Sequence, residues 1–233
     1  MDLNIIYEDN DVLAIDKPAG VVVFHEALSM KHEAKTVIDL LVEKYPELKK
    51  AGEAPRYGIV HRLDKDTSGV LLVAKSSEAL IFLQKQFKNR EVGKKYIALA
   101  TGVIKDDSGT IKTFIERSPA DPRKQRAVET GEREAVTEYK VLERFKDYTL
   151  LEVTMKTGRK HQIRCHLAHI HHPIAGDKLY GFKDSPKPED LERQFLHASY
   201  LKIQLLDGQI KEFTSELPEE LQTIIMNLEA RSL

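Results

Sequence analysis

The segment from His61 to Gly69, HRLDKDTSG, concentrates side chains that could do chemistry. It carries two carboxylates, Asp64 and Asp66, with Arg62 just before them and a Thr-Ser-Gly sequence just after. A carboxylate can act as a nucleophile or as a general base. Reactive side chains are common on loops that adjacent strands hold in place, and hydroxyl residues can fix the shape of such a loop. We interpret this segment as a candidate reactive loop.

Other uses of the same residues are open at this point. A calcium loop would use Asp64, Asp66 and Ser68 as ligands, but its last ligand must be a glutamate and Lys75 stands there. An aspartic protease would need two such loops sharing a proton, and its Asp-Thr-Gly pattern is interrupted here by Ser68. A salt-bridged surface turn, with the preceding arginine paired to one carboxylate, is the plainest alternative.

A second dense segment, from Thr157 to Gly181, is rich in histidine and basic residues. His166 and His169 lie three positions apart on a predicted helix and could face one metal ion. A metal site usually needs a third ligand, often a carboxylate, and no His-Glu-x-x-His pattern is present. We therefore expect no metal, and because the sequence has no nucleotide-binding fingerprint we expect no organic cofactor either.

The same helix offers a different use for Arg164. Ile163, Leu167 and Ile170 share one helical face and should pack inward, with Arg164 on the shoulder of that stripe. Its stem would lie in the core while its guanidinium meets a partly buried carboxylate. Either this is an ordinary salt bridge, or Arg164 orients a reactive aspartate and keeps it ionised.

Short strands and a few helices must position these segments. A helix over 36–48 is indicated by an apolar stripe and by the capping pair Thr36 and Asp39. Hydrophobic periodicity and turn residues predict further elements. The expected strands cover 3–7, 12–15, 21–24, 57–60, 70–74, 95–100, 135–142 and 148–155, with a hairpin of 196–205 and 210–213, and the other expected helices cover 77–89, 162–170 and 218–228. Many strands with few helices indicate the α+β class.

Composition sets the broad class of protein. The chain has 233 residues, 41% of them hydrophobic and 31% charged, which is typical of a globular protein. The formal net charge is −1, so only local basic clusters could attract nucleic acid. One cysteine, no readable signal peptide and no long apolar run lead us to expect a cytoplasmic protein without a membrane segment.

Taken together, five ordered motifs resemble those of the RluA-type pseudouridine synthases. They span roughly residues 5–215, and the nine-residue segment is by far the most specific of them. The matching segments are Lys17-Pro18-Ala19-Gly20, His61 to Gly69, Lys95-Tyr96, Gly158 to Leu167 followed by Gly176 to Gly181, and Phe195 to Ala198.

The resemblance implies a fold, a reaction and roles for particular residues. The fold would be a mixed, largely antiparallel β-sheet with flanking helices and a central active-site cleft. Asp64 would be the catalytic nucleophile, Tyr96 would line the uracil pocket, and Arg164 would pair with Asp64. The enzyme would isomerise a uridine of ribosomal or transfer RNA without a cofactor, while Arg62 would enter the space that the flipped nucleotide leaves. A non-catalytic RNA-binding or chaperone protein on the same scaffold is the alternative.

The resemblance has two departures. Many relatives carry an N-terminal S4 domain, whereas this chain starts almost at the catalytic core, so we expect one catalytic domain over 1–233 and no S4 domain. Lys160 stands where the family often has a small hydroxyl residue. RNA is the expected partner, and no obligate protein partner is readable. The expected RNA contacts are Lys17, His61, Arg62, Arg123, Lys124, Arg126, Arg159, Lys160, His161 and Gln162.

Overall fold

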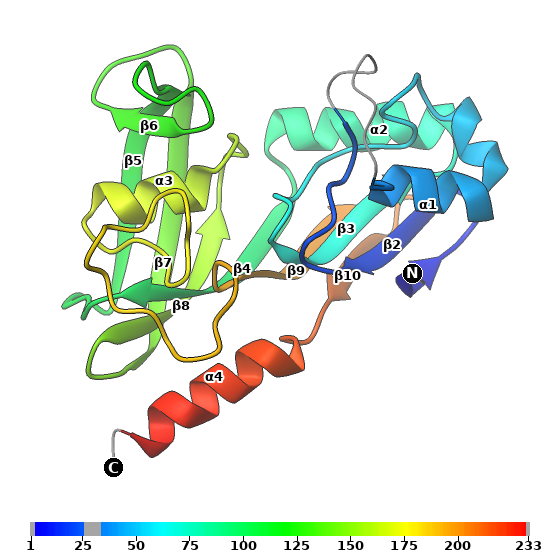
Figure 1. Cartoon of the computed structure of the whole chain (residues 1–233). Helices are drawn as coiled ribbons and strands as arrows, with labels where there is room; N and C mark the ends of the chain where they lie inside the picture. Colours follow the sequence, from blue (N-terminus) through cyan, green and yellow to red (C-terminus); the bar gives the residue numbers. More distant parts are fainter. Residues whose placement is uncertain (1–2, 26–33, 232–233) are drawn as a thin grey trace. The chain divides into compact units, whose positions relative to one another are not determined.

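The computed structural model describes residues 3–25 and 34–231 and divides into two compact units (Figure 1). Unit 1 comprises Met1–Gly93 and Ala198–Glu216, and unit 2 comprises Lys94–His197 and Leu217–Leu233. Each unit combines antiparallel strands with helices, which confirms the predicted α+β class. The expectation of one domain over the whole chain stays a prediction.

The sheet of unit 1 is built from strands that lie far apart in the sequence. Strand β2 pairs antiparallel with β1 and β3, β9 is the neighbour of β3, and β10 pairs antiparallel with β9. The predicted hairpin near the C-terminal end is therefore confirmed. These strands are β1 (Asn4–Glu8), β2 (Val12–Lys17), β3 (Ser68–Ala74), β9 (Leu196–Gln204) and β10 (Ile210–Thr214).

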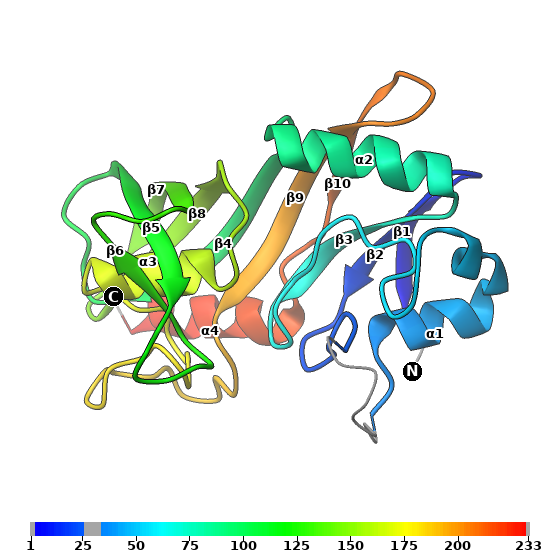
Figure 2. The same cartoon turned by 90° about the horizontal axis from the view of Figure 1, so that it is seen from above.

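Two helices cover opposite faces of this sheet, α1 (Val37–Lys44) and α2 (Ser77–Asn89) (Figure 2). Side chains of successive strand residues point to opposite faces. In β2, Leu13 therefore packs with the α1 residues, while Val12 packs with the α2 residues. Because both faces are covered, β2 and β3 are almost continuously apolar, and Leu71 in β3 is fully buried.

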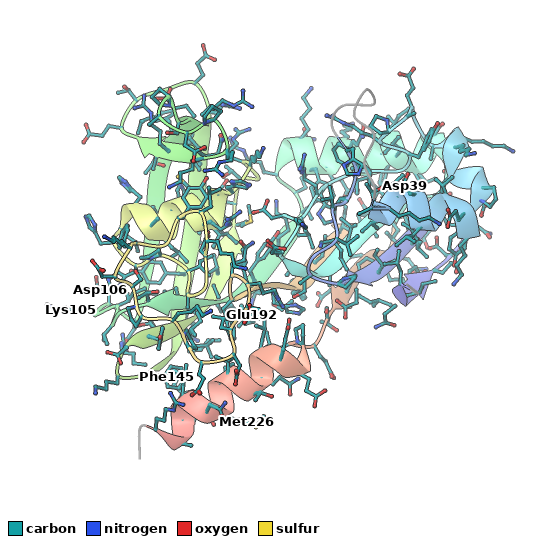
Figure 3. The ribbon with its side chains drawn as sticks, in the orientation of Figure 1. Asp39, Lys105, Asp106, Phe145, Glu192 and Met226 are labelled. Atoms are coloured by element: carbon teal, nitrogen blue, oxygen red, sulfur yellow. The ribbon has the colours of Figure 1, made fainter. Side chains whose placement is uncertain are left out.

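The start of α1 follows the sequence prediction and its end does not. Thr36 Oγ1 accepts a hydrogen bond from the Asp39 amide at 3.1 Å, and Asp39 Oδ2 accepts one from the Thr36 amide at 2.8 Å. Asp39 is labelled in Figure 3. This reciprocal capping box satisfies two amides at the helix N-terminus. The predicted helix over 36–48 is too long, because Pro46 cannot continue it. A separate 3₁₀ helix, Pro46–Lys50, follows.

Two segments predicted as strands are not strands in the structure. Residues 21–24 form no strand, and the Val22 carbonyl accepts a hydrogen bond from the Val37 amide at 2.9 Å. This contact satisfies an amide at the start of α1 that has no partner within the helix. Residues 57–60 contribute only an isolated bridge from Ile59 to β3. Apolar, β-branched composition was a misleading signal in both places.

Unit 2 has the strand order β4-β8-β7-β5-β6, with every pair antiparallel. Helix α3 (Gln162–His169) packs beside β6 and β7 (Figure 1). The C-terminal helix α4 (Glu219–Ala230) begins after Pro218, which is its N-cap and not part of its first turn. No helix in the described part of the chain is long and apolar enough to cross a membrane. The strands are β4 (Gly93–Thr101), β5 (Ser108–Arg117), β6 (Gln125–Val128), β7 (Glu134–Arg144) and β8 (Tyr148–Met155).

The close approach of β3 and β9 requires a glycine at position 69. Gly69 has φ +114°, and a Cβ there would lie 2.2 Å from the Ala198 carbonyl oxygen. We expect Gly69→Ala to lower the free energy of unfolding by roughly 2–4 kcal/mol, because backbone strain and a backbone clash add. Gly208→Ala is the control, since φ is +86° there but no atom lies within 4 Å. Urea unfolding of both variants tests this. Equal losses in the free energy of unfolding would mean that the close approach of β3 and β9 does not add to the cost of the substitution.

Candidate active site

Asp64 lies in a tight turn that leads directly into β3 in unit 1. The Thr67 amide donates to the Asp64 carbonyl at 3.1 Å, which closes the turn. Thr67 and Ser68 are buried, whereas Asp64 is half-buried. The carboxylate is therefore carried on a short segment whose far end is fixed in the sheet.

Lys17 holds this turn in place through its side chain. Its Nζ donates to the carbonyls of Pro18 at 2.7 Å, Val21 at 2.9 Å and Lys65 at 3.0 Å. The Gly20 amide also donates to the Lys65 carbonyl, at 2.9 Å. The Lys-Pro-Ala-Gly motif and the Asp64 segment are thus one local structure. Because the Lys17 side chain is fully buried, this arrangement argues against the phosphate contact predicted for it.

His61 and Arg62 differ in their surroundings. His61 Nε2 lies 3.0 Å from the Leu72 amide, which donates to it, and the ring stacks on Phe87 with centroids 4.9 Å apart. This contact assigns Nε2 the acceptor role and gives His61 a structural task. Arg62 is exposed, and its guanidinium lies 5.0 Å from the centre of the Phe24 ring. Of the two, Arg62 fits an RNA contact better.

Tyr96 lies on β4 in unit 2, opposite Val153 of β8, and is buried. Lys95 beside it forms an ion pair with Glu152 at 3.1 Å. Lys94 is also buried, and burial lowers the pKa of its ammonium group. A cation two residues before the tyrosine was not singled out from the sequence.

Arg164 forms a buried two-pronged ion pair with Asp177. Its Nε donates to Asp177 Oδ2 at 2.7 Å and its Nη2 donates to Oδ1 at 2.8 Å. The side chains are 9% and 0% exposed. The guanidinium also lies 5.1 Å from the centre of the Tyr180 ring. The structure gives Arg164 a buried carboxylate partner, Asp177, that the sequence did not reveal, while its predicted pairing with Asp64 stays a prediction.

Several contacts keep Asp177 ionised. Burial by itself raises the pKa of this carboxyl group. Hydrogen bonds and charge from Arg164, together with the amides of Leu179 and Tyr180 at 2.9 Å each, outweigh burial and lower the pKa below its usual value. Asp177 therefore supplies a fixed negative charge that orients Arg164.

Gln162, at the start of α3, uses both ends of its amide inside the protein. Its Oε1 accepts from Thr157 Oγ1 at 2.7 Å and from the Arg159 amide at 3.0 Å. Its Nε2 donates to the Val136 carbonyl at 3.0 Å and to Thr137 Oγ1 at 2.9 Å. This buried network argues against the direct RNA contact predicted for Gln162 and shows that it anchors α3 to β7.

His166 is buried on the same helix, and its ring nitrogens are occupied. Nδ1 lies 2.8 Å from Thr137 Oγ1 and Nε2 lies 3.0 Å from Thr113 Oγ1. Burial lowers the pKa of His166 to about 4, so the ring is neutral near pH 7. The alternative of a metal held by His166 and His169 has no support, and the described residues contain no cluster suited to a metal ion.

The other predicted RNA contacts are basic residues of unit 2 with varied surroundings. Arg123 and Arg126 are exposed and pair with nearby carboxylates, and Lys124 lies 6.0 Å from the Tyr180 ring centre. Arg159 Nε donates to a backbone carbonyl at 3.1 Å, while Lys160 is exposed. Their roles toward RNA stay predictions. His161 is the N-cap of α3, with φ +55°, and its Nδ1 lies 3.1 Å from the Tyr180 hydroxyl.

The predicted catalytic residues belong to both units. Asp64 lies in unit 1, and Tyr96 and Arg164 lie in unit 2. Their convergence in one cleft therefore stays a prediction. The sequence motif contains Asp177 and Tyr180 but gives them no task. The hydrophobic residues around Asp177 and Tyr180, and the glycine before them, could have indicated a buried loop. They could not have indicated that Arg164 is the partner of Asp177.

Known proteins are similar in sequence to most of this chain. A family model described as RNA pseudouridylate synthase matches residues 11–169. An RNA pseudouridine synthase of Bacillus subtilis is 43% identical over 98% of this chain and 73% of its own length. Ribosomal large subunit pseudouridine synthase D of Pasteurella multocida is 37% identical over 99% of this chain and 72% of its own.

Solved structures agree with the sequence relatives. The human RNA pseudouridylate synthase domain containing 4 protein has a TM-score of 0.75 at 25% identity, covering 97% of this chain and 93% of that one. The chain therefore belongs to the RNA pseudouridylate synthase family, as its motifs indicated. It is an isomerase that acts on RNA.

The Arg164–Asp177 pair makes stability depend on pH in a defined direction. We expect Asp177→Asn to lower the free energy of unfolding by about 3–5 kcal/mol at pH 7, because it leaves a buried guanidinium without its counter-charge. The pKa of Asp177 is lower in the folded state than in the unfolded chain, so its contribution is present above about pH 4 and is lost as the pH falls through the folded-state pKa. Urea unfolding at a series of pH values tests this, because the free energies of unfolding of the variant and the wild type should approach each other as the pH falls.

Asp121→Asn is the matched control for this prediction. Asp121 also pairs with an arginine and also has a lowered pKa, but the pair is exposed, so little change is expected. Equal effects of the two substitutions would show that burial does not strengthen the Arg164–Asp177 pair.

Proposed function

We propose that this enzyme isomerises a uridine of large-subunit ribosomal RNA, with Asp64 as its nucleophile. The name of the Pasteurella multocida relative supports this class of RNA, and such a substrate would place the reaction in the cytoplasm. The observation that carries the catalytic assignment is the position of Asp64: a half-buried carboxylate on a turn braced by the buried Lys17.

The reaction moves one bond and needs no oxidant or reductant. The N1–C1′ glycosidic bond breaks, a C5–C1′ bond forms, C5 loses a proton and N1 gains one. Asp64 would attack either C1′ of the ribose or C6 of the uracil, and it leaves again when the new bond is complete. The carboxylate must be ionised to act in either route.

The other predicted residues would hold the target in place. A target within a stem must first leave the base stack, which costs a few kcal/mol, and the exposed Arg62 would offset this by filling the gap. Tyr96 would present its ring to the flipped uracil. Arg164, already fixed by Asp177, would pair with the Asp64 carboxylate and orient it. The Asp177 pair supports this role because it limits where the guanidinium can point.

Two alternatives have different consequences. Transfer RNA could be the substrate, since stem-loops of both RNA classes offer a uridine to flip. A non-catalytic RNA-binding protein on the same scaffold would need neither the Asp64 carboxylate nor an ionised state of it. The following experiment separates all of these.

We expect Asp64→Asn to reduce pseudouridine formation by about 10⁴-fold or more, the order seen when a nucleophile is removed, while the thermal melting temperature stays near that of the wild type. The measurement is carbodiimide mapping of an unmodified large-subunit ribosomal RNA transcript after incubation with purified enzyme. A pool of unmodified transfer RNA transcripts is treated in parallel.

Asp66→Asn is the matched control, because it removes a second half-buried carboxylate from the same turn. It should cost far less activity. Full activity of Asp64→Asn would exclude Asp64 as the nucleophile. Modification of transfer RNA alone would overturn the ribosomal substrate, and no modification by the wild type in either pool would favour a binding protein.

A further inference from the structure

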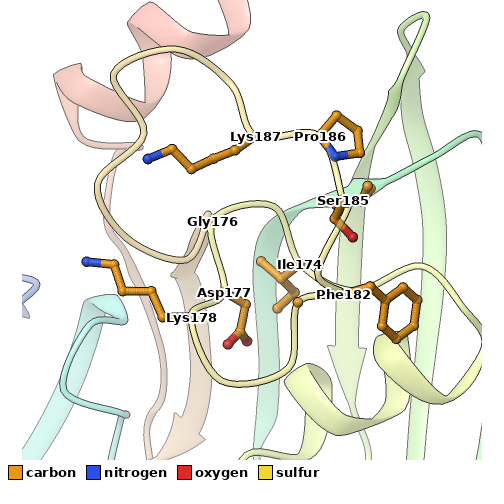
Figure 4. A pocket seen from close by; sticks show the side chains of 10 residues that line it. Ile174, Gly176, Asp177, Lys178, Phe182, Ser185, Pro186 and Lys187 are labelled. Carbon is orange, nitrogen blue, oxygen red and sulfur yellow. The ribbon is translucent and has the colours of Figure 1, made fainter.

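A pocket of about 240 Å³ lies within unit 2, between the end of β4 and the loop that connects α3 to β9 (Figure 4). Thr101 contributes the β4 side. The loop contributes nine residues between Ile174 and Lys187, and they include two lysines, a serine and a phenylalanine. None of these residues was among the RNA contacts expected from the sequence.

Two lysines are the only lining residues of the pocket whose charge is not balanced by an ion pair among the described residues. Lys178 and Lys187 are exposed, and neither forms an ion pair with any residue in the described part of the chain. The carboxylate that also lines the pocket, Asp177, is neutralised by Arg164 and has a side chain that is 0% exposed. The two ammonium groups therefore determine the sign of charge that the pocket attracts, which is negative.

Thr101 supplies a second indication that a ligand belongs here. Its hydroxyl is buried and has no hydrogen-bond partner, and it is the one such side-chain group among the described residues. Buried polar groups are nearly always paired, so an exception calls for an explanation. Its backbone is satisfied, since the amide donates to the Pro173 carbonyl at 2.8 Å and the carbonyl lies 2.9 Å from His172 Nδ1. Only the hydroxyl of this pocket-lining residue lacks a partner.

The opposite side of the pocket offers an aromatic ring. Phe182 is 48% exposed, and Figure 4 shows Phe182 and Ser185 on one side of the pocket with Lys178 and Lys187 extending on the other. Aromatic rings beside basic side chains are the usual means of holding unpaired nucleotides, because every base has a face for stacking. A nucleotide lying across the pocket would bring its phosphate to the lysines and its base or ribose to Phe182.

We propose that this pocket binds one unpaired nucleotide of the substrate RNA, outside the target uridine. Lys178 and Lys187 hold its phosphate, Ser185 and Thr101 offer hydroxyl hydrogen bonds, and Phe182 stacks on its base. The inference rests on the proposed RNA substrate. The pocket is smaller than the roughly 300–1,000 Å³ of sites that enclose drug-sized ligands, which fits part of a polymer better than a whole cofactor.

One residue of the pocket also contacts a predicted catalytic residue. Asp177 lines the pocket and orients Arg164 through two hydrogen bonds. A nucleotide held here is therefore held by the same loop that fixes the guanidinium, so RNA binding and the placement of Arg164 stabilise one loop conformation. This gives the enzyme a contact that positions RNA without touching the reacting base.

Filter binding of an unmodified large-subunit ribosomal RNA transcript over a range of salt concentrations tests the proposal. We expect the double substitution Lys178→Ala/Lys187→Ala to weaken binding by about tenfold or more and to reduce the slope of log K against log salt by about 0.7 for each phosphate that no longer meets an ammonium group. Phe182→Ala should weaken binding by about fivefold or more, and Thr101→Val by about two- to tenfold. In turnover assays KM should rise by a larger factor than kcat falls.

Lys183→Ala is the matched control, because Lys183 is an exposed lysine of the same loop that does not line the pocket. Its effect should stay below about twofold. Unchanged affinity and salt slope in the lysine double variant, relative to Lys183→Ala, would overturn the proposal. Calorimetric titration with inorganic phosphate and with uridine 5′-monophosphate tests the alternative that the pocket binds a free phosphate compound and not RNA. Tight binding of a free ligand without any effect of the variants on RNA affinity would also overturn it.

The two proposals fail in different ways. If the wild type forms no pseudouridine, the proposed function fails, while the binding data still report on the pocket. If the wild type modifies the transcript and the pocket variants match it in affinity, salt slope and KM, the pocket inference fails and the function stands.

Discussion

The hydrogen bonds of one buried ammonium group hold the candidate nucleophile in place. Lys17 Nζ reaches the carbonyls of Pro18, Val21 and Lys65, and so ties the end of β2 to the turn that carries Asp64. Burying a charge is costly unless it is well hydrogen-bonded, so such a residue is retained where its geometry is needed. Here the hydrogen bonds of Lys17 fix the position of the turn, and with it the Asp64 carboxylate, relative to the sheet.

Unit 2 solves a similar problem with an ion pair. Arg164 is fixed by Asp177, which is itself fixed by the amides of Leu179 and Tyr180. Gln162 and His166 then fasten α3 to its sheet through a buried network of threonine hydroxyls. In both units a charged side chain that could act on RNA is positioned by backbone groups and buried partners, which accords with the need of catalysis for preorganised charge.

The elements that local physics determines could be predicted from the sequence. Helix α2 was expected at 77–89 and is found there, because an N-cap serine and an apolar stripe act within its own length. The first predicted helix ends earlier than expected because Pro46 follows it. Residues 21–24 contact the start of α1 instead of forming a strand, since an apolar segment can be buried either as a strand or as an irregular segment packed on a helix. The sheet order depends on contacts between distant segments and was not predictable from periodicity.

The candidate site shows the same division. The motifs identified the segments, but not the partners that act through space. Lys17 was expected at a phosphate because it is a lysine in a glycine-containing turn, yet its side chain turns inward to carbonyls 4 and 48 residues further along. Asp177 was invisible as the partner of Arg164 because 13 residues of loop and helix separate them. Long-range side-chain pairing is the information that a single sequence does not contain.

The most direct measurement of this account is the turnover of Lys17→Met on the ribosomal transcript, with hydrogen exchange at the Gly20 amide, which bonds to the Lys65 carbonyl, measured alongside. Met keeps the unbranched apolar stem up to the Cε position and removes the ammonium group with its hydrogen bonds. A loosened turn should exchange faster at Gly20 and should lower kcat by about 10²-fold with little change in KM, since a misplacement of about 1 Å can cost that much. Lys65→Met, which keeps the carbonyl, should behave as wild type. Wild-type kcat in a folded Lys17→Met protein would contradict the claim that this ammonium group positions the nucleophile.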